Sequence, residues 1–271
     1  MARIEVKDIS FSYDGGPEVL SGVSMEIPEG TSVTIMGANG AGKTTLVKTL
    51  NGLLLPTKGT VLIDGIDTRK SRVSQIARKV GVIFQNPEKQ FFAETVEEEL
   101  SFGPRNMGFS GQETKKRVLL VAEQFGLAQY LVKNPFDLSG GEKRRLSIAS
   151  VLVWEPEVIV IDEPTLGLDY PYRRYLISTL RSLVSVKRTV IIVTHDIDFA
   201  VQTSKMAVLM SQGKILWSGP MVSLLKSPEV LTTANMIQTF LASLLADTLG
   251  QGRVQDQESL EHLTRFLEES F

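Results

Sequence analysis

A glycine-rich stretch, Gly37-Ala-Asn-Gly-Ala-Gly-Lys43-Thr44-Thr45, constrains the fold of this chain more than any other feature. It fits the pattern G-x-x-x-x-G-K-[ST], in which backbone N–H groups surround a phosphate. The β-branched apolar run 32–36 precedes it, and residues 45–50 follow with helical spacing. This motif requires the order strand, glycine loop and helix, so the sequence predicts a phosphate-binding loop within an α/β fold.

The residue types of this loop explain its chemistry. Glycines let the backbone pass close to an anion without a Cβ clash, and the inward N–H groups form a nest at a helix start. We expect Lys43 to reach the β- and γ-phosphates and Thr44 to offer its hydroxyl to Mg²⁺. An ordinary glycine-rich turn is the alternative, and the flanking strand and helix argue against it. The predicted nucleotide-binding residues of the loop are Gly37, Asn39, Gly40, Ala41, Gly42, Lys43, Thr44 and Thr45.

Composition narrows the class of protein. The 271 residues, 42% of them hydrophobic, can form one large α/β domain or a core domain with an inserted subdomain. The net charge of −2 gives no basic footprint for nucleic acid, and without cysteine neither a disulfide framework nor a thiolate metal site can form. We find no signal-peptide pattern at the start and no apolar run near the ~20 residues that span a membrane. We therefore expect a cytosolic protein whose membrane role, if any, comes through a partner.

Two alternating segments, residues 3–13 and 19–27, precede the glycine loop and are bounded by turns at 14–17 and 28–30. They predict an antiparallel pair of strands ahead of the loop. Tyr13 lies where the first segment ends. It can serve as a core aromatic residue or as a face on which adenine stacks.

Helical patterns replace strand patterns between about residues 86 and 155. We interpret this region as an inserted helical subdomain. Thr95-Val-Glu-Glu98 has the form of a capping box. The predicted helices cover 95–100, 111–125 and 140–153, and the residues that separate them are Gly103, Pro104, Gly108 and Gly126.

Polar side chains follow three apolar strands. In an open α/β sheet, ligands bind at the carboxyl ends of the strands. Asp162 can therefore lie beside Mg²⁺, whereas Glu163, which points the opposite way on a strand, needs a sharp turn, helped by Pro164, to reach the same site. The alternative for each of these strand-end residues is a polar side chain that simply meets solvent. The phosphate loop earlier in the chain favours a shared ligand site instead. The residues are Gln85 after 80–84, Asp162 and Glu163 after 157–161, and His195 after 189–194.

A second candidate anion site begins the last helix of the helical region. Ser139 is predicted to cap that helix. Gly140 and Gly141 just inside it weaken a helix by roughly 1 kcal/mol each, which makes sense if the helix start must approach a ligand closely. Its exposed N–H groups form an anion site. Because one nucleotide needs one such loop, we interpret this site as facing the nucleotide of another subunit.

The C-terminal part is predicted to hold a hairpin over 205–210 and 214–217, then helices over 222–226 and 233–249. Gly250-Gln-Gly252 is the expected flexible joint. Residues 255–271 carry apolar side chains at helical spacing, with five acidic residues and one arginine. This segment can be a solvated tail helix or a pairing surface for a second subunit.

Taken in order, these motifs resemble the nucleotide-binding subunits of the ATP-binding cassette (ABC) superfamily over residues 1 to about 225. The resemblance implies a P-loop NTPase core with an antiparallel β-subdomain, an inserted α-helical subdomain and a C-terminal helical extension. It places the ATPase domain at 1–220 and the extension, with a possible dimerisation role, at 221–271. It also implies two subunits arranged head to tail, with ATP and Mg²⁺ bound between them.

The resemblance assigns roles to individual residues. Glu142 departs from the family signature, which more often has Gln at this position, while Ser139, Gly140 and Gly141 are intact. The implied catalytic residues are Glu163, His195, Lys43 and Gln85, and the implied metal ligands are Thr44, Gln85 and Asp162. Further nucleotide contacts are implied for Tyr13 with adenine, for Ser139, Gly140 and Gly141 of the signature, and for Asp169 of the intersubunit Asp loop.

A narrower resemblance rests on the segments Gln85-Asn-Pro-Glu-Lys-Gln90 and Thr95-Val-Glu-Glu-Glu-Leu-Ser-Phe-Gly-Pro104. They are similar to those in the ATPase subunits of energy-coupling factor transporters, which import vitamins and transition-metal ions. This implies a membrane-embedded component, a substrate-binding membrane protein, and a location on the cytoplasmic face of the cell membrane. In that group, the segment around Gln90 contacts the membrane component and a C-terminal helical extension joins two ATPases.

Other readings stay open. The chain could belong to another kind of ABC importer or exporter, to a soluble ABC ATPase in DNA repair or translation, or to a non-hydrolysing interaction module. The repair type needs a long coiled coil, and the translation type carries two cassettes. The intact Lys43 and Glu163 argue against the interaction module.

Overall fold

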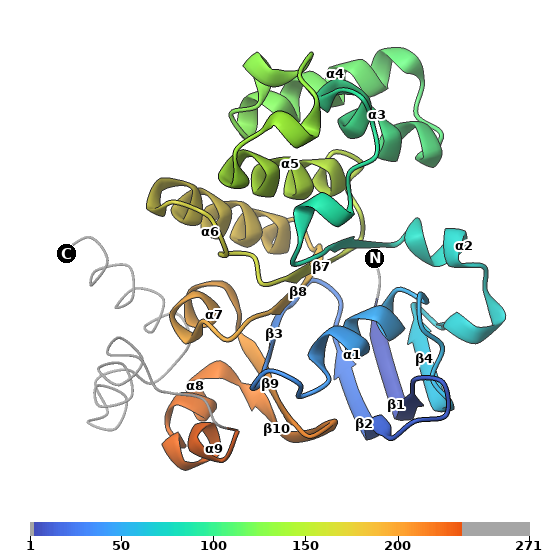
Figure 1. Ribbon diagram of the computed structural model, residues 1–271. Helices are drawn as coiled ribbons and strands as arrows, with labels where there is room; N and C mark the ends of the chain where they lie inside the picture. Colours follow the sequence, from blue (N-terminus) through green and yellow to red (C-terminus); the bar gives the residue numbers. More distant parts are fainter. Residues whose placement is uncertain (1–2, 235–271) are drawn as a thin grey trace.

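The computed structural model describes residues 3–234, and their strands form two sheets (Figure 1). The first sheet is antiparallel, with the strand order β2-β1-β4-β5. Ile4 of β1 faces Ile27 of β2, so the antiparallel pair predicted ahead of the glycine loop is confirmed. The strands are β1 (Ile4–Ser12), β2 (Glu18–Ile27), β4 (Lys58–Ile63) and β5 (Ile66–Asp67).

The second sheet carries the predicted strand ends. Its order is β10-β9-β3-β8-β7-β6, parallel from β9 to β6 and antiparallel between β9 and β10. All five residues of β7 are buried, and alternate ones join different apolar clusters, which explains its continuous apolar run. The strands are β3 (Ser32–Met36), β6 (Val80–Ile83), β7 (Val158–Asp162), β8 (Thr189–Val193), β9 (Met206–Ser211) and β10 (Lys214–Pro220).

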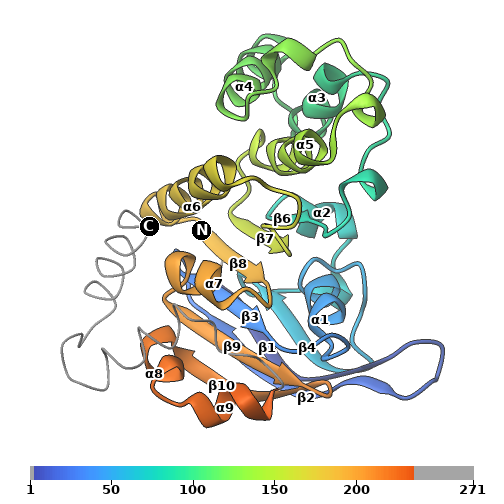
Figure 2. The same ribbon diagram turned by 60° about the vertical axis from the view of Figure 1, so that its left-hand side comes forward.

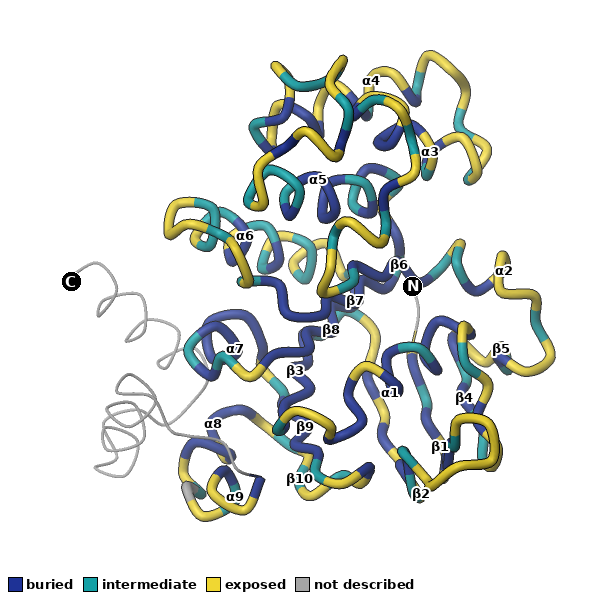
Figure 3. Tube along the Cα trace, viewed as in Figure 1, coloured by how far each residue is buried: buried dark blue, intermediate teal, exposed yellow. Residues whose placement is uncertain are grey.

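Helix α1 (Lys43–Leu50) lies between the two sheets and starts at the end of the glycine loop. Its Leu46, Val47 and Leu50 share one apolar cluster with residues of both sheets. Figure 3 shows this central region as the most buried part of the molecule. The connection from β4 to β6 contains α2 (Val73–Ala77). Short 3₁₀ turns occur at Thr68–Lys70, Pro87–Lys89, Ala128–Tyr130 and Pro135–Asp137.

Helices α3 (Val96–Met107), α4 (Gly111–Gln124) and α5 (Gly140–Leu152) form a separate lobe at one end of the molecule, as both ribbon views show (Figures 1 and 2). Each begins at a hydroxyl that accepts a hydrogen bond from the amide three residues on, which is the usual reason for a helix to start there. These caps are Thr95, Ser110 and Ser139.

The expectation that Gly103 and Pro104 separate two helices is wrong. Helix α3 runs through both residues and ends before Gly108, whose φ of 93° is left-handed. A Cβ on Gly103 would lie 2.3 Å from Cδ1 of Trp154. The glycine therefore serves close packing of α3 against an indole ring instead of breaking the helix.

The remaining helices are α6 (Tyr170–Ser185), α7 (Ile197–Thr203), α8 (Met221–Leu225) and α9 (Pro228–Thr233). The seven-residue α7 was not predicted, and neither was α9, which ends at residue 233, where the helix expected over 233–249 begins. The predictions for residues 235–271, including the joint at 250–252, lie outside the described residues. Among residues 3–234, none of the helices combines the length and the apolar character that crossing a bilayer requires.

Candidate nucleotide-binding site

The glycine loop passes so close to its neighbours that side chains would not fit. Gly37 has φ 149°, and a Cβ there would lie 2.2 Å from the carbonyl oxygen of Met210 on β9. Gly42, at the N-cap of α1, has φ 99° and a Cβ would meet Val19 O at 3.0 Å. The backbone therefore folds into a tight loop whose amides precede a helix, as the motif requires.

Lys43 is buried and reaches back into this loop. Its Nζ donates to the carbonyl oxygens of Gly37 at 2.7 Å and Ala38 at 3.0 Å. Burial lowers the pKa of Lys43, and the nearby carboxylates of Glu163 and Asp162 oppose that shift. The ammonium group is thus held at the mouth of the loop, where phosphate oxygens can take the place of the carbonyls.

Thr44 and Asp162 form the pair expected for a magnesium ion. Thr44 Oγ1 donates to Asp162 Oδ2 at 3.0 Å, and Asp162 lies at the buried end of β7. Burial raises the pKa of Asp162, against the hydrogen bond from Thr44. A hydroxyl and a carboxylate are hard oxygen ligands and fit Mg²⁺. Among the described residues, no cluster of three or more acidic or histidine side chains is available to bind a metal, and Mg²⁺ commonly takes its other ligands from phosphate and water.

Glu163 sits in a left-handed turn directly after β7. Its φ is 47°, which is unusual for a residue with a side chain. Its amide donates to Val193 O at 2.7 Å, so the turn is fixed to β8. The predicted sharp turn after Asp162 is therefore confirmed, and it brings both carboxylates to one side of the sheet.

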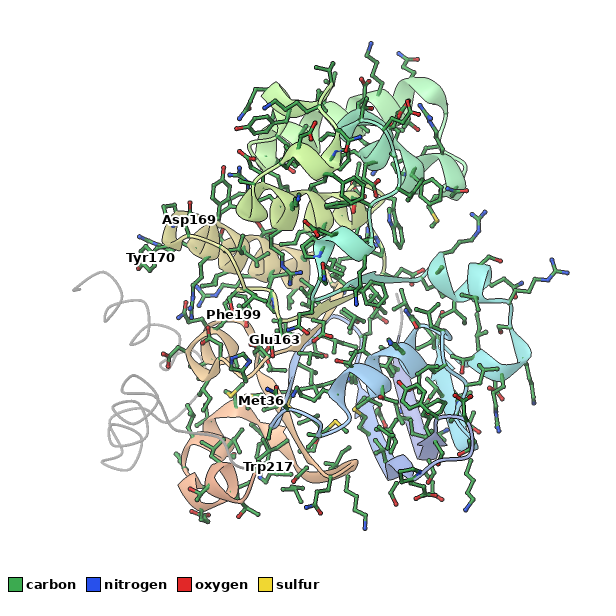
Figure 4. All side chains as sticks on the ribbon, viewed as in Figure 1. Met36, Glu163, Asp169, Tyr170, Phe199 and Trp217 are labelled. Atoms are coloured by element: carbon green, nitrogen blue, oxygen red, sulfur yellow. The ribbon has the colours of Figure 1, made fainter. Side chains whose placement is uncertain are left out.

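The carboxylate of Glu163 is held by two residues that follow β8. Thr194 Oγ1 donates to Oε2 at 3.0 Å, and Nδ1 of His195 lies 2.8 Å from Oε1. The side chain of His195 is 69% exposed, whereas that of Glu163 is 11% exposed. Figure 4 shows Glu163 at the centre of the molecule. The imidazole thus links a buried carboxylate to the open surface.

A cavity of about 210 Å³ joins these groups. Gln85, which follows β6, lines it together with residues of the glycine loop, so the edge of the parallel sheet collects three of the predicted strand-end residues, Gln85, Asp162 and Glu163. The lining residues are Val19, Asn39, Gly40, Ala41, Gly42, Lys43, Thr44, Thr45, Gln85, Asp162 and Glu163.

Tyr13 stands beside the cavity. Its hydroxyl lies 3.2 Å from Thr45 Oγ1, and its ring meets the ring of Phe11 edge-on with the centroids 4.8 Å apart. The residue is 44% exposed. An aromatic ring that is anchored next to a phosphate loop and open on one side suits the stacking of a base.

The signature residues lie apart from this cavity. Ser139 and Glu142 form a reciprocal capping box, with Ser139 N donating to Glu142 Oε2 at 2.8 Å and Glu142 N donating to Ser139 Oγ at 3.4 Å. A glutamine would make the same box, so Glu142 preserves the local geometry. A Cβ on Gly140 would meet nothing within 4 Å. The start of α5 is therefore open, and neither Ser139 nor the two glycines line the cavity of their own chain.

Asp169 also lies away from the cavity. It caps α6, with Oδ1 accepting from Tyr172 N at 3.0 Å. Figure 4 shows Asp169 and Tyr170 at the outer end of α6, separate from Glu163.

Arg144 is a residue that sequence reasoning missed. It is 1% exposed and donates hydrogen bonds to backbone carbonyls at the carboxyl ends of β6 and β7. The run Lys143-Arg144-Arg145 looks like an exposed charged face in the sequence. The one sequence signal for burial of Arg144 was its position one turn after Gly140, the predicted start of the helix.

Fold and site together define a P-loop ATPase of the cassette type, with a glycine loop, a strand end whose carboxylate and neighbouring hydroxyl fit Mg²⁺, and a second carboxylate in the same cavity. A profile of the ABC transporter family matches residues 20–166. The chain belongs to this family, and it is an ATPase subunit of an ABC transporter.

The relatives agree with this assignment. The chain is 44% identical to a putative ABC transporter ATP-binding protein of Pyrococcus abyssi over 244 residues, which cover 87% of this chain and 94% of that protein. It is 40% identical to an energy-coupling factor transporter ATP-binding protein of Methanocaldococcus jannaschii over 247 residues, with 90% and 88% covered.

Solved structures share the fold. The structure of cbiO1 from Clostridium perfringens, part of the ABC transporter complex cbiONQ, matches with a TM-score of 0.71 and 32% identity, covering 89% of this chain and 98% of that chain. A dimeric ATP-binding cassette in a post-hydrolysis state with ADP and phosphate matches with a TM-score of 0.75 and 28% identity, covering 80% and 98%.

Proposed function

We propose that this chain energises uptake of a vitamin or a transition-metal ion as the ATPase of an energy-coupling factor transporter. In this proposal, residues 1–220 form the ATPase domain, residues 221–271 form a C-terminal extension that joins two ATPases, and the chain lies on the cytoplasmic face of the membrane. The proposal draws support from relatives named as energy-coupling factor ATP-binding proteins in two archaea. The solved cbiO1 structure adds to it.

The observation that carries the proposed catalysis is the constellation around Glu163. Its carboxylate is buried, directed to the cavity by a left-handed turn, and held by Thr194 and His195. A fixed carboxylate beside a phosphate site can polarise the attacking water, and such help is typically worth 10²–10⁴-fold.

The other cavity residues supply placement and charge, which is most of what phosphoryl transfer needs. Lys43 neutralises the β- and γ-phosphates, and Thr44 with Asp162 would hold Mg²⁺. When bound, Mg²⁺ would offset the negative charge of the phosphates. Gln85, at the cavity edge, orients water and senses whether the γ-phosphate is present.

Two ATPases acting head to tail explain the open start of α5. Gly140 and Gly141 offer amides at an open helix start, and together with Ser139 they would close over the nucleotide of a second ATPase of the same or a related kind. Tyr13 would stack on the adenine, and Asp169 would contact the partner. The dimeric relative with ADP and phosphate supports this arrangement.

A groove of about 550 Å³ between α2, β6, α3 and α5 suits the membrane-embedded component. Phe92 and Phe102 lie at this groove and are 60% and 50% exposed, with their rings 4.5 Å apart. Gln90, which also lines the groove, donates to Ser150 Oγ at 3.2 Å. Because Gln90 and the cavity residue Gln85 belong to one short loop, an apolar helix of the membrane component seated here would sense nucleotide binding.

Purification of the tagged chain from washed membranes tests this proposal. We expect membrane-embedded proteins to co-purify with it, and ATP-dependent uptake of one vitamin or metal ion to be lost when the chain is deleted. Phe92→Glu should release the membrane proteins while the purified chain keeps its ability to bind ATP. A chain that fractionates with ribosomes or DNA, with no membrane protein attached, would favour a soluble ABC ATPase instead.

A further inference from the structure

Arg144 makes five hydrogen bonds, and all of them end on backbone carbonyl oxygens. Its Nη1 donates to Phe84 O at 2.6 Å and Gln85 O at 3.4 Å. Its Nη2 donates to Asp162 O at 2.8 Å and Glu163 O at 2.6 Å, and its Nε donates to Pro164 O at 3.4 Å. Five bonds match the five N–H donors of a guanidinium group.

These carbonyls belong to the two strand ends that supply the hydrolytic residues. Phe84 and Gln85 follow β6, Asp162 is the last residue of β7, and Glu163 and Pro164 follow it. Arg144 itself lies one turn into α5, whose first residues carry the open amides of Gly140 and Gly141. One buried side chain therefore connects the start of α5 with Gln85 and Glu163.

The bonds also surround the most unusual backbone of the site. Glu163 has a left-handed φ of 47°, and such a conformation in a residue with a side chain persists only where the surroundings over-determine it. Arg144 holds the carbonyls of Asp162, Glu163 and Pro164. It thus fixes the residue in the strained conformation together with both of its neighbours.

A purely structural role does not explain a charge at this place. Burial lowers the pKa of Arg144 to about 10, against the opposing effects of the Asp162 and Glu163 charges, so the group stays protonated at neutral pH. Burying an ion is costly unless its donors are satisfied, and an apolar side chain of similar volume often stabilises a protein as well or better. The free-energy cost of burying the guanidinium is explained if its hydrogen bonds are needed to hold the two strand ends in one geometry.

We infer that Arg144 is a positioning residue that holds Glu163 in its productive turn and makes the start of α5 move as one body with Gln85 and Glu163. This inference rests on the proposed function, because it assumes hydrolysis at Glu163 and a second ATPase that meets Ser139–Gly141. In that arrangement, Arg144 links the nucleotide site of its own chain to the part of α5 that contacts the other nucleotide.

Arg144→Lys tests this role because lysine keeps the charge and loses the planar five-donor fork. We expect the kcat for ATP to fall about 10²-fold, the effect of an ångström-scale misplacement. The Kd for ATP should stay within about threefold, since the glycine loop is untouched. A crystal structure of the variant should show Glu163 outside the left-handed region.

Arg181→Lys is the matched control. Arg181 is another arginine that joins two elements through a backbone carbonyl, with Nε donating to Gln202 O at 2.8 Å, and it lies outside the cavity. The control should keep the wild-type kcat even if its Tm falls. This separates loss of a structural contact from loss of positioning.

Wild-type kcat in Arg144→Lys would overturn the inference. So would equal losses of kcat, ATP affinity and Tm in both lysine variants, or a variant structure in which Glu163 keeps its φ and its contact with His195. A wild-type chain that does not hydrolyse ATP would contradict the proposed function instead. The φ angle of Glu163 in the Arg144→Lys structure would then be the remaining test of the inference, and a φ outside the left-handed region would support it.

Discussion

Glu163 and His195 face each other across the ends of β7 and β8, with Oε1 of the glutamate 2.8 Å from Nδ1 of the histidine. The glutamate is nearly buried and the histidine side chain is mostly exposed. The two strands are parallel neighbours, so the contact depends on their register and on the left-handed turn at Glu163. The pair therefore couples a carboxylate in the cavity to the surface where a second ATPase would close.

Replacing Glu163 by glutamine should separate binding from hydrolysis. The amide keeps the shape of the side chain and can still bond Thr194, but it cannot polarise water as a carboxylate does. We expect steady-state hydrolysis to fall about 10²–10⁴-fold and ATP affinity to be retained, measured by phosphate release and by equilibrium binding. Turnover at the wild-type rate would remove Glu163 from the catalytic role.

Replacing His195 by alanine should weaken hydrolysis without abolishing nucleotide binding. The imidazole fixes one oxygen of Glu163 while Thr194 fixes the other, so its loss leaves the carboxylate less well oriented. We expect kcat to fall roughly 10- to 100-fold, with little change in Tm because the side chain is exposed. A loss of ATP affinity equal to the loss of kcat would point to a binding role instead.

Asp162→Asn should stabilise the nucleotide-free chain at neutral pH. Burial raises the pKa of Asp162 above its ordinary value of 3.8. A raised pKa means that the folded state favours the protonated carboxyl. The contribution of Asp162 to the free energy of unfolding is therefore complete below that ordinary value, and it is lost as the pH rises through the folded-state pKa. The neutral amide avoids this loss, so we expect a gain of about 1 kcal/mol at pH 7.

The pH dependence of that gain is the decisive part of the measurement. In thermal unfolding experiments, the difference between Asp162→Asn and the wild type should shrink as the pH is lowered, because the wild-type carboxyl takes up a proton and becomes neutral like the amide. Magnesium-dependent ATP binding should weaken in the same variant. A stability difference that is constant between pH 4 and pH 7 would contradict the explanation from burial.

Gly103→Ala should destabilise the helical lobe. A Cβ at this position would lie 2.3 Å from the indole ring of Trp154, and overpacking of this kind costs about 1–3 kcal/mol. Gly111→Ala is the control, because Gly111 also lies in a helix and its Cβ would meet nothing within 4 Å. Equal Tm values for the two variants would contradict the packing role of Gly103.

Much of the site could be predicted because its signals are local. The glycine loop, the apolar strands and the polar residues at their ends follow directly from short sequence patterns, and the structure brings Gln85, Asp162 and Glu163 to one cavity. The turn at Glu163 could be inferred because adjacent strand residues point in opposite directions.

The rest depends on contacts between distant segments. Gly103 looked like a helix break because the approach of Trp154, 51 positions later in the sequence, is not visible in a local pattern. No sequence pattern singled out Arg144, because its five acceptors are backbone atoms, which carry no side-chain signal. Helix α7 is too short for its periodicity to stand out.

The central claim is that ATP is held between two ATPases, by the glycine loop of one and by Ser139–Gly141 of the other. Sedimentation velocity of Glu163→Gln tests it most directly, with and without ATP and Mg²⁺. We predict that the share of two-copy particles rises when ATP and Mg²⁺ are added, beyond any pairing through residues 221–271, and that wild-type activity per chain falls on dilution. A variant that sediments as one copy at saturating ATP, together with wild-type activity that is independent of concentration, would contradict the account.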